Sequence, residues 1–337
     1  MIKIDKHRYF ILYACCIPVK GHKRSVIYDL QRNTFIYIPN TVLELLQHNT
    51  IDIHDERYHD EKDDIIQIID YLIAQEMGFI TPEPNKFPKI NMKDDDYPEI
   101  IKNIIIDFDK KSNHDLENII NQVSEIWCST VELRYFDNVR ESTFVQHLSC
   151  FLKSTIRTIH VVIRYAPWIT EKKLNDICCK FKRLKQIIIY DSPMHLHTNN
   201  FGLETTSVFV KEYIENETCC GNIHPHYFRS NLDFFKESLI FNNCLYKKIS
   251  IDRNGMIKNC PAMKKTFGHI DSIKLLDVIS NNDFQKLWHI KKNDIDVCKD
   301  CEFRYMCLDC RALISDPDNI YSKPKKCNYD PYQTQWI

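Results

Sequence analysis

Seven cysteines in the last third of the chain have a spacing that few structures other than a metal-binding domain accommodate. The first is followed by ten residues, a glycine, four residues and a second cysteine, and a Cys-x2-Cys-x5-Cys-x2-Cys run and a final cysteine come later. Short Cys-x2-Cys pairs bring two thiolates to one metal centre, and longer gaps bring ligands from other elements. The spacing therefore predicts metal binding by Cys244, Cys260, Cys298, Cys301, Cys307, Cys310 and Cys327.

The first two cysteines of this set flank a predicted β-hairpin at residues 247–260. Its predicted turn is Arg253-Asn254-Gly255, in which Gly255 suits a left-handed backbone conformation. A helix is expected at residues 275–290. Cys307 and Cys310 are three residues apart, so both would project from one face if they lay on a helical turn.

The chemistry of the thiols leaves three kinds of cross-link open. Thiolates bind iron–sulfur clusters and also zinc, so one or two Zn²⁺ ions are the alternative to clusters, and disulfides are the third. We expect a cytoplasmic protein, because no stretch reaches the roughly 18 apolar residues of a membrane span and cytosolic thiols stay reduced. The apolar run at residues 9–17 would also suit a signal segment, but it is predicted to be a buried strand.

Composition and charge argue against several functions. The chain has 337 residues with 45 basic and 46 acidic side chains, so neither nucleic acid nor an acidic membrane surface is an expected partner. It contains six glycines, none of them close together. A phosphate-binding loop needs closely spaced glycines, so neither a P-loop nor a dinucleotide fingerprint is present. The length predicts two or three domains.

Two segments with different patterns precede the cysteine-rich region. Residues 1–82 are predicted to form a small α+β module, and a Pro-containing linker follows. Residues 98–217 alternate apolar strands with helices, which is typical of a parallel sheet or partial (β/α) barrel and indicates an α/β fold. The predicted strands are 9–17, 24–30, 34–38, 103–108, 131–136, 158–165, 185–190 and 207–213, and the predicted helices are one beginning after residue 40 and those at 63–76, 115–127, 142–153 and 170–181.

The seven cysteines and the internal glycine resemble the SPASM domain, the auxiliary-cluster domain of radical-SAM peptide-modifying enzymes. The resemblance covers about residues 240–330, within a predicted domain at 218–337, and departs from the family pattern by x2 instead of x3 before Cys310. It implies two [4Fe–4S] clusters, with Cys219, Cys220 or an open position completing the second one. The implied ligands are Cys298, Cys301, Cys307 and Cys327 for one cluster, and Cys244, Cys260 and Cys310 for the other.

One motif of that family is missing from the chain. Radical-SAM enzymes carry Cys-x3-Cys-x2-Cys after the first barrel strand, but here the loop at residues 109–115 contains no cysteine, and that spacing does not occur upstream of Cys244. The middle region is therefore expected to be a degenerate partial barrel that lacks the SAM-cleaving cluster. We assign no catalytic residue, because a fold does not by itself give a chemistry.

The whole arrangement resembles the SPASM-domain peptide maturases of grasp-with-spasm systems, to which residues 18–32 and 38–40 are also similar. The resemblance implies two partners, a ribosomally made precursor peptide and an ATP-grasp ligase. The N-terminal module resembles winged-helix-like leader-recognition domains, which bind a peptide as an added strand. Phe35, Ile36 and Tyr37 are its candidate peptide contacts, and ordinary strand core is the alternative.

Two further functions stay open at this point. An under-ligated cluster would act as a Lewis acid or electron-transfer centre and make the chain an enzyme in its own right. A zinc-stapled scaffold, structural or peptide-binding, would have no redox role. The pairs His195 with His197 and His224 with His226 are either metal or peptide ligands or parts of solvated loops.

Overall fold

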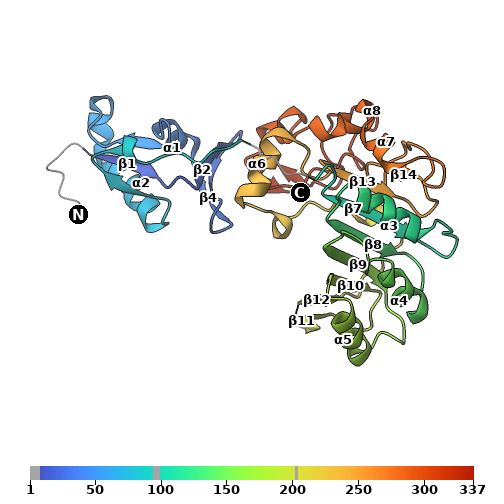
Figure 1. Ribbon diagram of the computed structural model, residues 1–337. Coiled ribbons are helices and arrows are strands. Elements are labelled where there is room, and N and C mark those ends of the chain that lie inside the picture. The colour runs from blue at the N-terminus through green and yellow to red at the C-terminus, as the bar shows by residue number, and fades with distance from the viewer. Residues whose placement is uncertain (1–7, 94–98, 202–203) are drawn as a thin grey trace.

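The computed structural model describes residues 8–93, 99–201 and 204–337 (Figure 1). Its N-terminal module contains two three-stranded antiparallel sheets, one in the order β5-β1-β6 and the other in the order β2-β3-β4. The elements are β1 (Tyr9–Leu12), β2 (Cys16–Lys20), β3 (Ser25–Asp29), β4 (Thr34–Ile38), α1 (Asn40–Leu45), β5 (Thr50–Asp52), η1 (Glu56–Glu61), α2 (Lys62–Ala74), β6 (Gly78–Thr81) and η2 (Pro84–Lys86).

The strand predicted at residues 9–17 is two strands in different sheets. The chain turns after Leu12, where the Cys16 amide donates to the Tyr13 carbonyl at 2.8 Å. Helix α2 forms where predicted, since Ile65, Ile69 and Leu72 recur at helical spacing and are buried. These side chains pack with those of β1 and β3 in the core of the module.

An eight-stranded sheet forms the centre of the molecule, in the order β11-β12-β10-β9-β8-β7-β13-β14. All neighbouring strands from β12 to β13 pair in parallel, and the two edge strands are antiparallel. The strands are β7 (Asn103–Phe108), β8 (Thr130–Tyr135), β9 (Thr158–Arg164), β10 (Leu184–Tyr190), β11 (Leu196–Phe201), β12 (Thr205–Phe209), β13 (Lys248–Ile251) and β14 (Ile257–Lys258). The predicted mixed α/β architecture with a mostly parallel sheet is confirmed.

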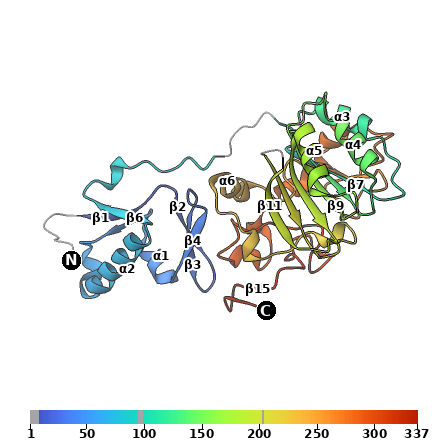
Figure 2. The ribbon, with the colours of Figure 1, turned by 90° about the horizontal axis from the view of Figure 1, so that it is seen from below.

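Helices cover one face of this sheet, as Figures 1 and 2 show. These are α3 (Leu116–Glu125), α4 (Glu141–Ser149) and α5 (Glu171–Lys180). On β9 the buried side chains Ile159, Val161 and Ile163 alternate with half-buried ones, so the two faces of the sheet differ in polarity. The opposite face is therefore free to carry charged groups.

The cysteine-rich region has little regular structure, and its hairpin extends the central sheet. Strand β13 pairs in parallel with β7, with Ile251 opposite Ile106, and β14 closes the predicted hairpin. Gly255 has a φ of +75° in the turn, as expected. The other elements are η3 (Glu217–Cys219), η4 (Pro225–Tyr227), α6 (Leu232–Ile240), α7 (Leu275–Ile279), α8 (Asn282–Gln285), η5 (Lys286–His289), η6 (Lys292–Asp294), η7 (Cys298–Asp300), β15 (Tyr329–Asp330) and β16 (Gln335–Trp336).

Two local predictions for this region were wrong. The helix expected at residues 275–290 is broken, because the Asn281 side chain accepts the Asp283 amide at 2.8 Å and starts a new helix. Residues 307–310 are not helical, so Cys307 and Cys310 do not share a helical face. Among the described helices, none is long and apolar enough to cross a lipid bilayer.

Candidate metal centres

Four of the seven tail cysteines line one cavity, which we call the tail site. They are Cys298, Cys301, Cys307 and Cys327. Cys298 begins η7, and Cys301 follows directly after it, so one tight turn supplies two thiols. Aromatic rings of Phe228, Phe303, Tyr329 and Trp336 form much of the remaining wall. The cavity is thus lined by thiols and by apolar side chains.

Burial raises the pKa of three of the four tail-site thiols. Burial, with smaller contributions from neighbouring thiols, raises the pKa of Cys307 to about 12 and raises the pKa of Cys298 and Cys301. The buried Lys292 ammonium lies 3.8 Å from Cys298 Sγ and opposes this effect. Without a metal these thiols are neutral, and a bound metal would displace their protons.

The remaining three tail cysteines gather at a second position, which we call the sheet site. Burial, together with the Cys244 and Cys220 thiols, raises the pKa of Cys260 to about 12. Burial likewise raises the pKa of Cys244 and Cys310, and Cys220 contributes to both shifts. The Lys248 ammonium on β13 lies 3.7 Å from Cys244 Sγ. Cys220 therefore lies close enough to the other three thiols to affect their ionisation.

The segment that carries Cys220 is held against the sheet site. A Cβ on Gly221 would lie 2.9 Å from Cys310 Sγ, so the backbone at this point touches that thiol. The Lys326 ammonium donates to the carbonyl oxygens of Thr218 at 2.7 Å and Cys220 at 2.8 Å. Cys220 itself is exposed. The sequence predicted Cys219 or Cys220 as a possible extra ligand. Cys220 contributes to the raised pKa values of the sheet-site thiols, whereas Cys219 is not among the causes given for them.

A single zinc ion and a four-iron cluster need thiols at different spacings. Sulfurs bound to one tetrahedral Zn²⁺ at 2.3 Å lie roughly 3.8 Å apart. No three of the eight described thiols in the two sites lie within 4.8 Å of one another. A four-iron cluster binds each thiolate through a different iron and needs wider spacing.

One other set of potential ligands lies close together in the described part of the chain. Atoms of Cys15, Cys16 and Asp29 are within 4.8 Å of one another. The Asp29 carboxylate is already used, because it accepts the amides of Gln31 at 3.0 Å and Arg32 at 2.9 Å and pairs with the Arg32 side chain. Cys16 is a core residue at the start of β2, and Cys15 packs against the same core.

Charged residues on the helix-free face of the central sheet lie near the sheet site. Arg134 on β8 donates to both carboxylate oxygens of Asp107 on β7, at 2.6 and 2.7 Å. The neighbouring Glu132 raises the pKa of Lys248, and Cys220 contributes to the raised pKa of Arg134. The sheet site is thus linked electrostatically to the face that a (β/α) barrel would enclose.

The N-terminal module contacts the tail site through a buried carboxylate. Glu302, next to Cys301, is fully buried and accepts from Arg24 Nε at 2.7 Å and from the Tyr329 hydroxyl at 2.5 Å. The Tyr28 hydroxyl donates to the Glu302 carbonyl at 2.5 Å. A ligand-bearing loop is thereby attached to strand β3 of the N-terminal module.

The candidate peptide contacts on β4 lie at the same junction. The rings of Phe35 and Tyr37 lie 5.8 and 6.1 Å from that of Phe303, and Arg24 covers the Tyr37 ring at 3.8 Å. Ile36 points the other way, into the core of the N-terminal module. Two of these side chains therefore contact the cysteine-rich region, and their role in peptide binding stays a prediction.

Three of the four histidines in these pairs are exposed. His224 and His226 stack with ring centroids 4.6 Å apart, and His224 lies 6.1 Å from the Trp336 ring at the rim of the tail site. His195 is exposed, and the side chain of His197 lies outside the described residues. Neither His224 nor His226 contributes to the pKa shifts of the described tail-site or sheet-site thiols.

The fold and the two sites together define a mixed α/β protein with two four-thiol candidate metal centres. No protein-family model and no curated protein matches the chain. It is similar to two solved structures of SuiB from Streptococcus suis. One is bound to the precursor peptide SuiA (11% identity, TM-score 0.30) and the other to S-adenosylmethionine (12% identity, TM-score 0.32). In both comparisons the match covers 90% of this chain and 96% of the other, and these TM-scores are too low to define its fold or function.

Proposed function

We propose that this chain is a SPASM-type iron–sulfur protein that acts in the maturation of a ribosomally made peptide. The observation that carries the proposal is the division of eight thiols into two sets of four. The tail site takes Cys298, Cys301, Cys307 and Cys327, and the sheet site takes Cys244, Cys260, Cys310 and Cys220. This is the division that the resemblance to SPASM domains implies, with Cys220 added as the fourth ligand.

The residues present suit a [4Fe–4S] cluster at each site. A cluster with four thiolate ligands carries net negative charge, and burying it is costly without a compensating cation. Each site supplies one ammonium, from Lys292 at the tail site and Lys248 at the sheet site. When bound, such clusters would supply electron transfer or hold the surrounding loops in place. This chain's own residues would screen them from water and set their potentials through these charges.

The partners follow from the same proposal. The N-terminal module, proposed to span residues 1–82, would bind the precursor peptide, and the segment at 98–217 would act as a degenerate partial barrel. The loop between β7 and α3 has no cysteine, so this chain would use no SAM-cleaving cluster there. Bond formation would then fall to an ATP-grasp ligase that binds this protein. Attachment of the N-terminal module beside Cys301 supports a role in presenting the peptide.

Metal analysis tests the proposal directly. After anaerobic purification we expect about eight iron and eight sulfide per chain, because two [4Fe–4S] clusters contain that number. Cys301→Ala and Cys260→Ala should each lose up to half of both elements, from different sites. Cys179→Ala is the matched control, because this exposed thiol on α5 belongs to neither site and should leave the content unchanged. Zinc without iron or sulfide would overturn the proposal in favour of a scaffold.

The partner assignment needs a separate experiment. If a short peptide and an ATP-grasp ligase are encoded beside the gene, both should co-purify with the cluster-loaded protein. Mass analysis of the peptide after incubation with this protein alone then separates an accessory from an enzyme. Absence of binding to both partners, with iron content intact, would contradict the role in peptide maturation.

A further inference from the structure

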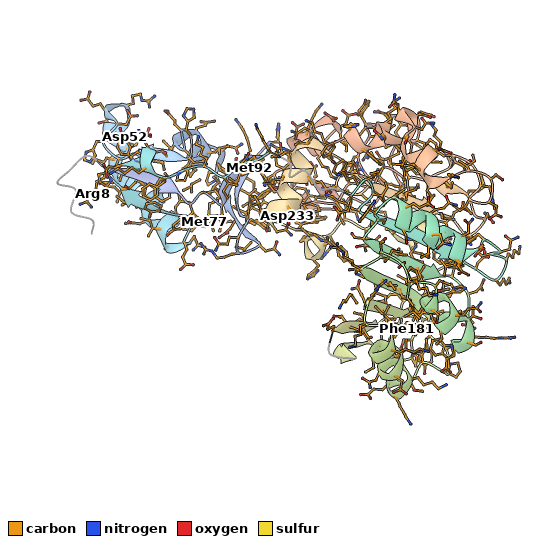
Figure 3. The ribbon with its side chains drawn as sticks, viewed as in Figure 1. Arg8, Asp52, Met77, Met92, Phe181 and Asp233 are labelled. Carbon is orange, nitrogen blue, oxygen red and sulfur yellow. The ribbon has the colours of Figure 1, made fainter. Side chains whose placement is uncertain are left out.

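A large groove lies where the N-terminal module, the linker and α6 meet. Its volume is about 1120 Å³, above the range of about 300–1,000 Å³ that is typical of small-molecule sites. One wall comes from β1, β2 and the linker, and the other from Phe235, Leu239, Arg304 and Tyr305. Figure 3 places Met92 of the linker between the module and the helix that carries Asp233. The groove has room for several residues of a peptide.

Apolar and aromatic side chains form most of the groove. The ring of Tyr13 lies 5.4 Å from that of Phe79, which in turn lies 4.8 Å from Phe87. Tyr13 is 38% exposed and Phe87 is 45% exposed, although both are large rings next to other apolar groups. Contiguous exposed apolar surface of this kind marks binding sites.

The charges that the described residues bring to the groove are all of one sign. Lys20, Lys89 and Arg304 line it, and none of the described lining residues is Asp or Glu. The chain as a whole has 45 basic and 46 acidic side chains, so this bias is local. The Nε atom of Arg304 is buried without a hydrogen-bond partner. A buried, unused donor among cations favours an occupant with carboxylates.

The backbone along one wall suits an extended occupant. Strand β2 is an edge strand of its sheet, and residues 17–20 of it line the groove. An edge strand presents unpaired backbone groups to which an extended peptide can add. The backbone carbonyl of Lys20 accepts a hydrogen bond from Arg304 Nη1 at 2.5 Å, so the Arg304 guanidinium lies at this edge.

We propose that this groove binds an extended peptide segment in which acidic side chains stand among large apolar ones. The proposal rests on the proposed function only in that a precursor peptide would supply the segment. Apolar side chains would enter the aromatic wall formed by Tyr13, Phe79 and Phe87, and carboxylates would face Lys20, Lys89 and Arg304. This is a different surface from the Phe35 and Tyr37 side of β4, which packs on Phe303.

Two labelled decapeptides test the groove on the full-length, cluster-loaded protein by fluorescence anisotropy. One alternates glutamate with leucine and phenylalanine, and the other has lysine in place of glutamate. We expect the acidic peptide to bind to the wild-type protein. The double substitution Lys20→Glu, Lys89→Glu should weaken its affinity by at least about tenfold, because charge reversal opposes complementary pairing. Lys153→Glu, an exposed position outside the groove, should change nothing. Phe87→Ser should weaken binding of the acidic peptide, but the protein should still prefer the acidic peptide to the lysine peptide.

Equal binding of the two peptides, or an acidic peptide unaffected by both groove variants, would overturn the proposal. Iron content and circular dichroism of each variant show whether it is folded. If the natural precursor binds the Lys20→Glu, Lys89→Glu variant with unchanged affinity, the groove assignment fails and the proposed function stands. If the wild-type protein holds zinc alone, the proposed function fails, and peptide binding still reports on the groove.

Discussion

Replacing Arg24 by alanine should loosen the N-terminal module from the tail site. The Glu302 carboxylate is fully buried, and Arg24 is the cation that pairs with it, at 2.7 Å. Breaking a buried pair by removing one partner costs about 3–5 kcal/mol, whereas an exposed pair is worth at most about 1 kcal/mol. The Arg24 side chain is 29% exposed, so water would reach part of the vacated space. We therefore expect a loss of about 2–3 kcal/mol.

A second substitution isolates the electrostatic cause. Glu302→Gln keeps the shape of the side chain and removes the charge that Arg24 compensates. In the Arg24→Ala background, Glu302→Gln should recover part of the lost free energy of unfolding. The effects of the two substitutions on that free energy should therefore differ from additivity by at least about 1 kcal/mol. The Tyr329 hydroxyl, 2.5 Å from Glu302 Oε1, can still donate to the amide oxygen in that double variant.

The assay combines urea unfolding with hydrogen exchange of the amides in β2, β3 and β4, which lie at the junction. Lys86→Ala is the matched control, because Lys86 pairs with Glu83 on the surface of the same half of the molecule. Its effect should stay within about 0.5 kcal/mol. Additive effects of the Arg24 and Glu302 substitutions, or an Arg24→Ala variant as stable as the control, would refute the reasoning.

Three further outcomes are expected. Cys220→Ser should lose iron from the sheet site while Cys219→Ser retains the wild-type content, and the opposite pattern in iron analysis would reassign the fourth ligand. Gly255→Ala should cost about 1–3 kcal/mol in thermal unfolding, because φ is +75° and a Cβ would lie 2.5 Å from His269 Nε2. Burial lowers the pKa of His114 to about 4. The unfolded chain takes up this proton first, near pH 6.5, so stability should fall by about 1 kcal/mol between pH 7 and 5.5. His114→Gln should lack that component, and an unchanged pH dependence of the unfolding midpoint would contradict this assignment.

Periodicity and turn chemistry were enough to predict the main elements. The continuous apolar runs at β7 to β10 indicated a parallel sheet, and Arg253-Asn254-Gly255 indicated the hairpin. The turn after Leu12 was missed because residues 13–15 contain neither glycine nor proline. The pairing of β13 with β7 was also missed, since nothing in the sequence of a four-residue apolar strand specifies a partner over 140 positions away.

The candidate sites were predictable only in part. The division of the seven tail cysteines came from a family resemblance, and local spacing alone would not have placed Cys307 and Cys310 apart. Cys219 and Cys220 are neighbours in the sequence, so only the path of the backbone past Cys310 distinguishes them. The groove escaped prediction because its lining comes from five separated segments, none of which has a motif of its own.

The parallel pairing of β13 with β7 has a practical consequence for dividing the protein. A fragment that stops at residue 217 would keep β7 but lose β13, and so would present a long bare sheet edge rich in isoleucine. Such edges recruit other chains and cause aggregation. A deletion series meant to separate the scaffold from its cysteine-bearing half should therefore yield insoluble material, and the two halves are better studied by point substitution.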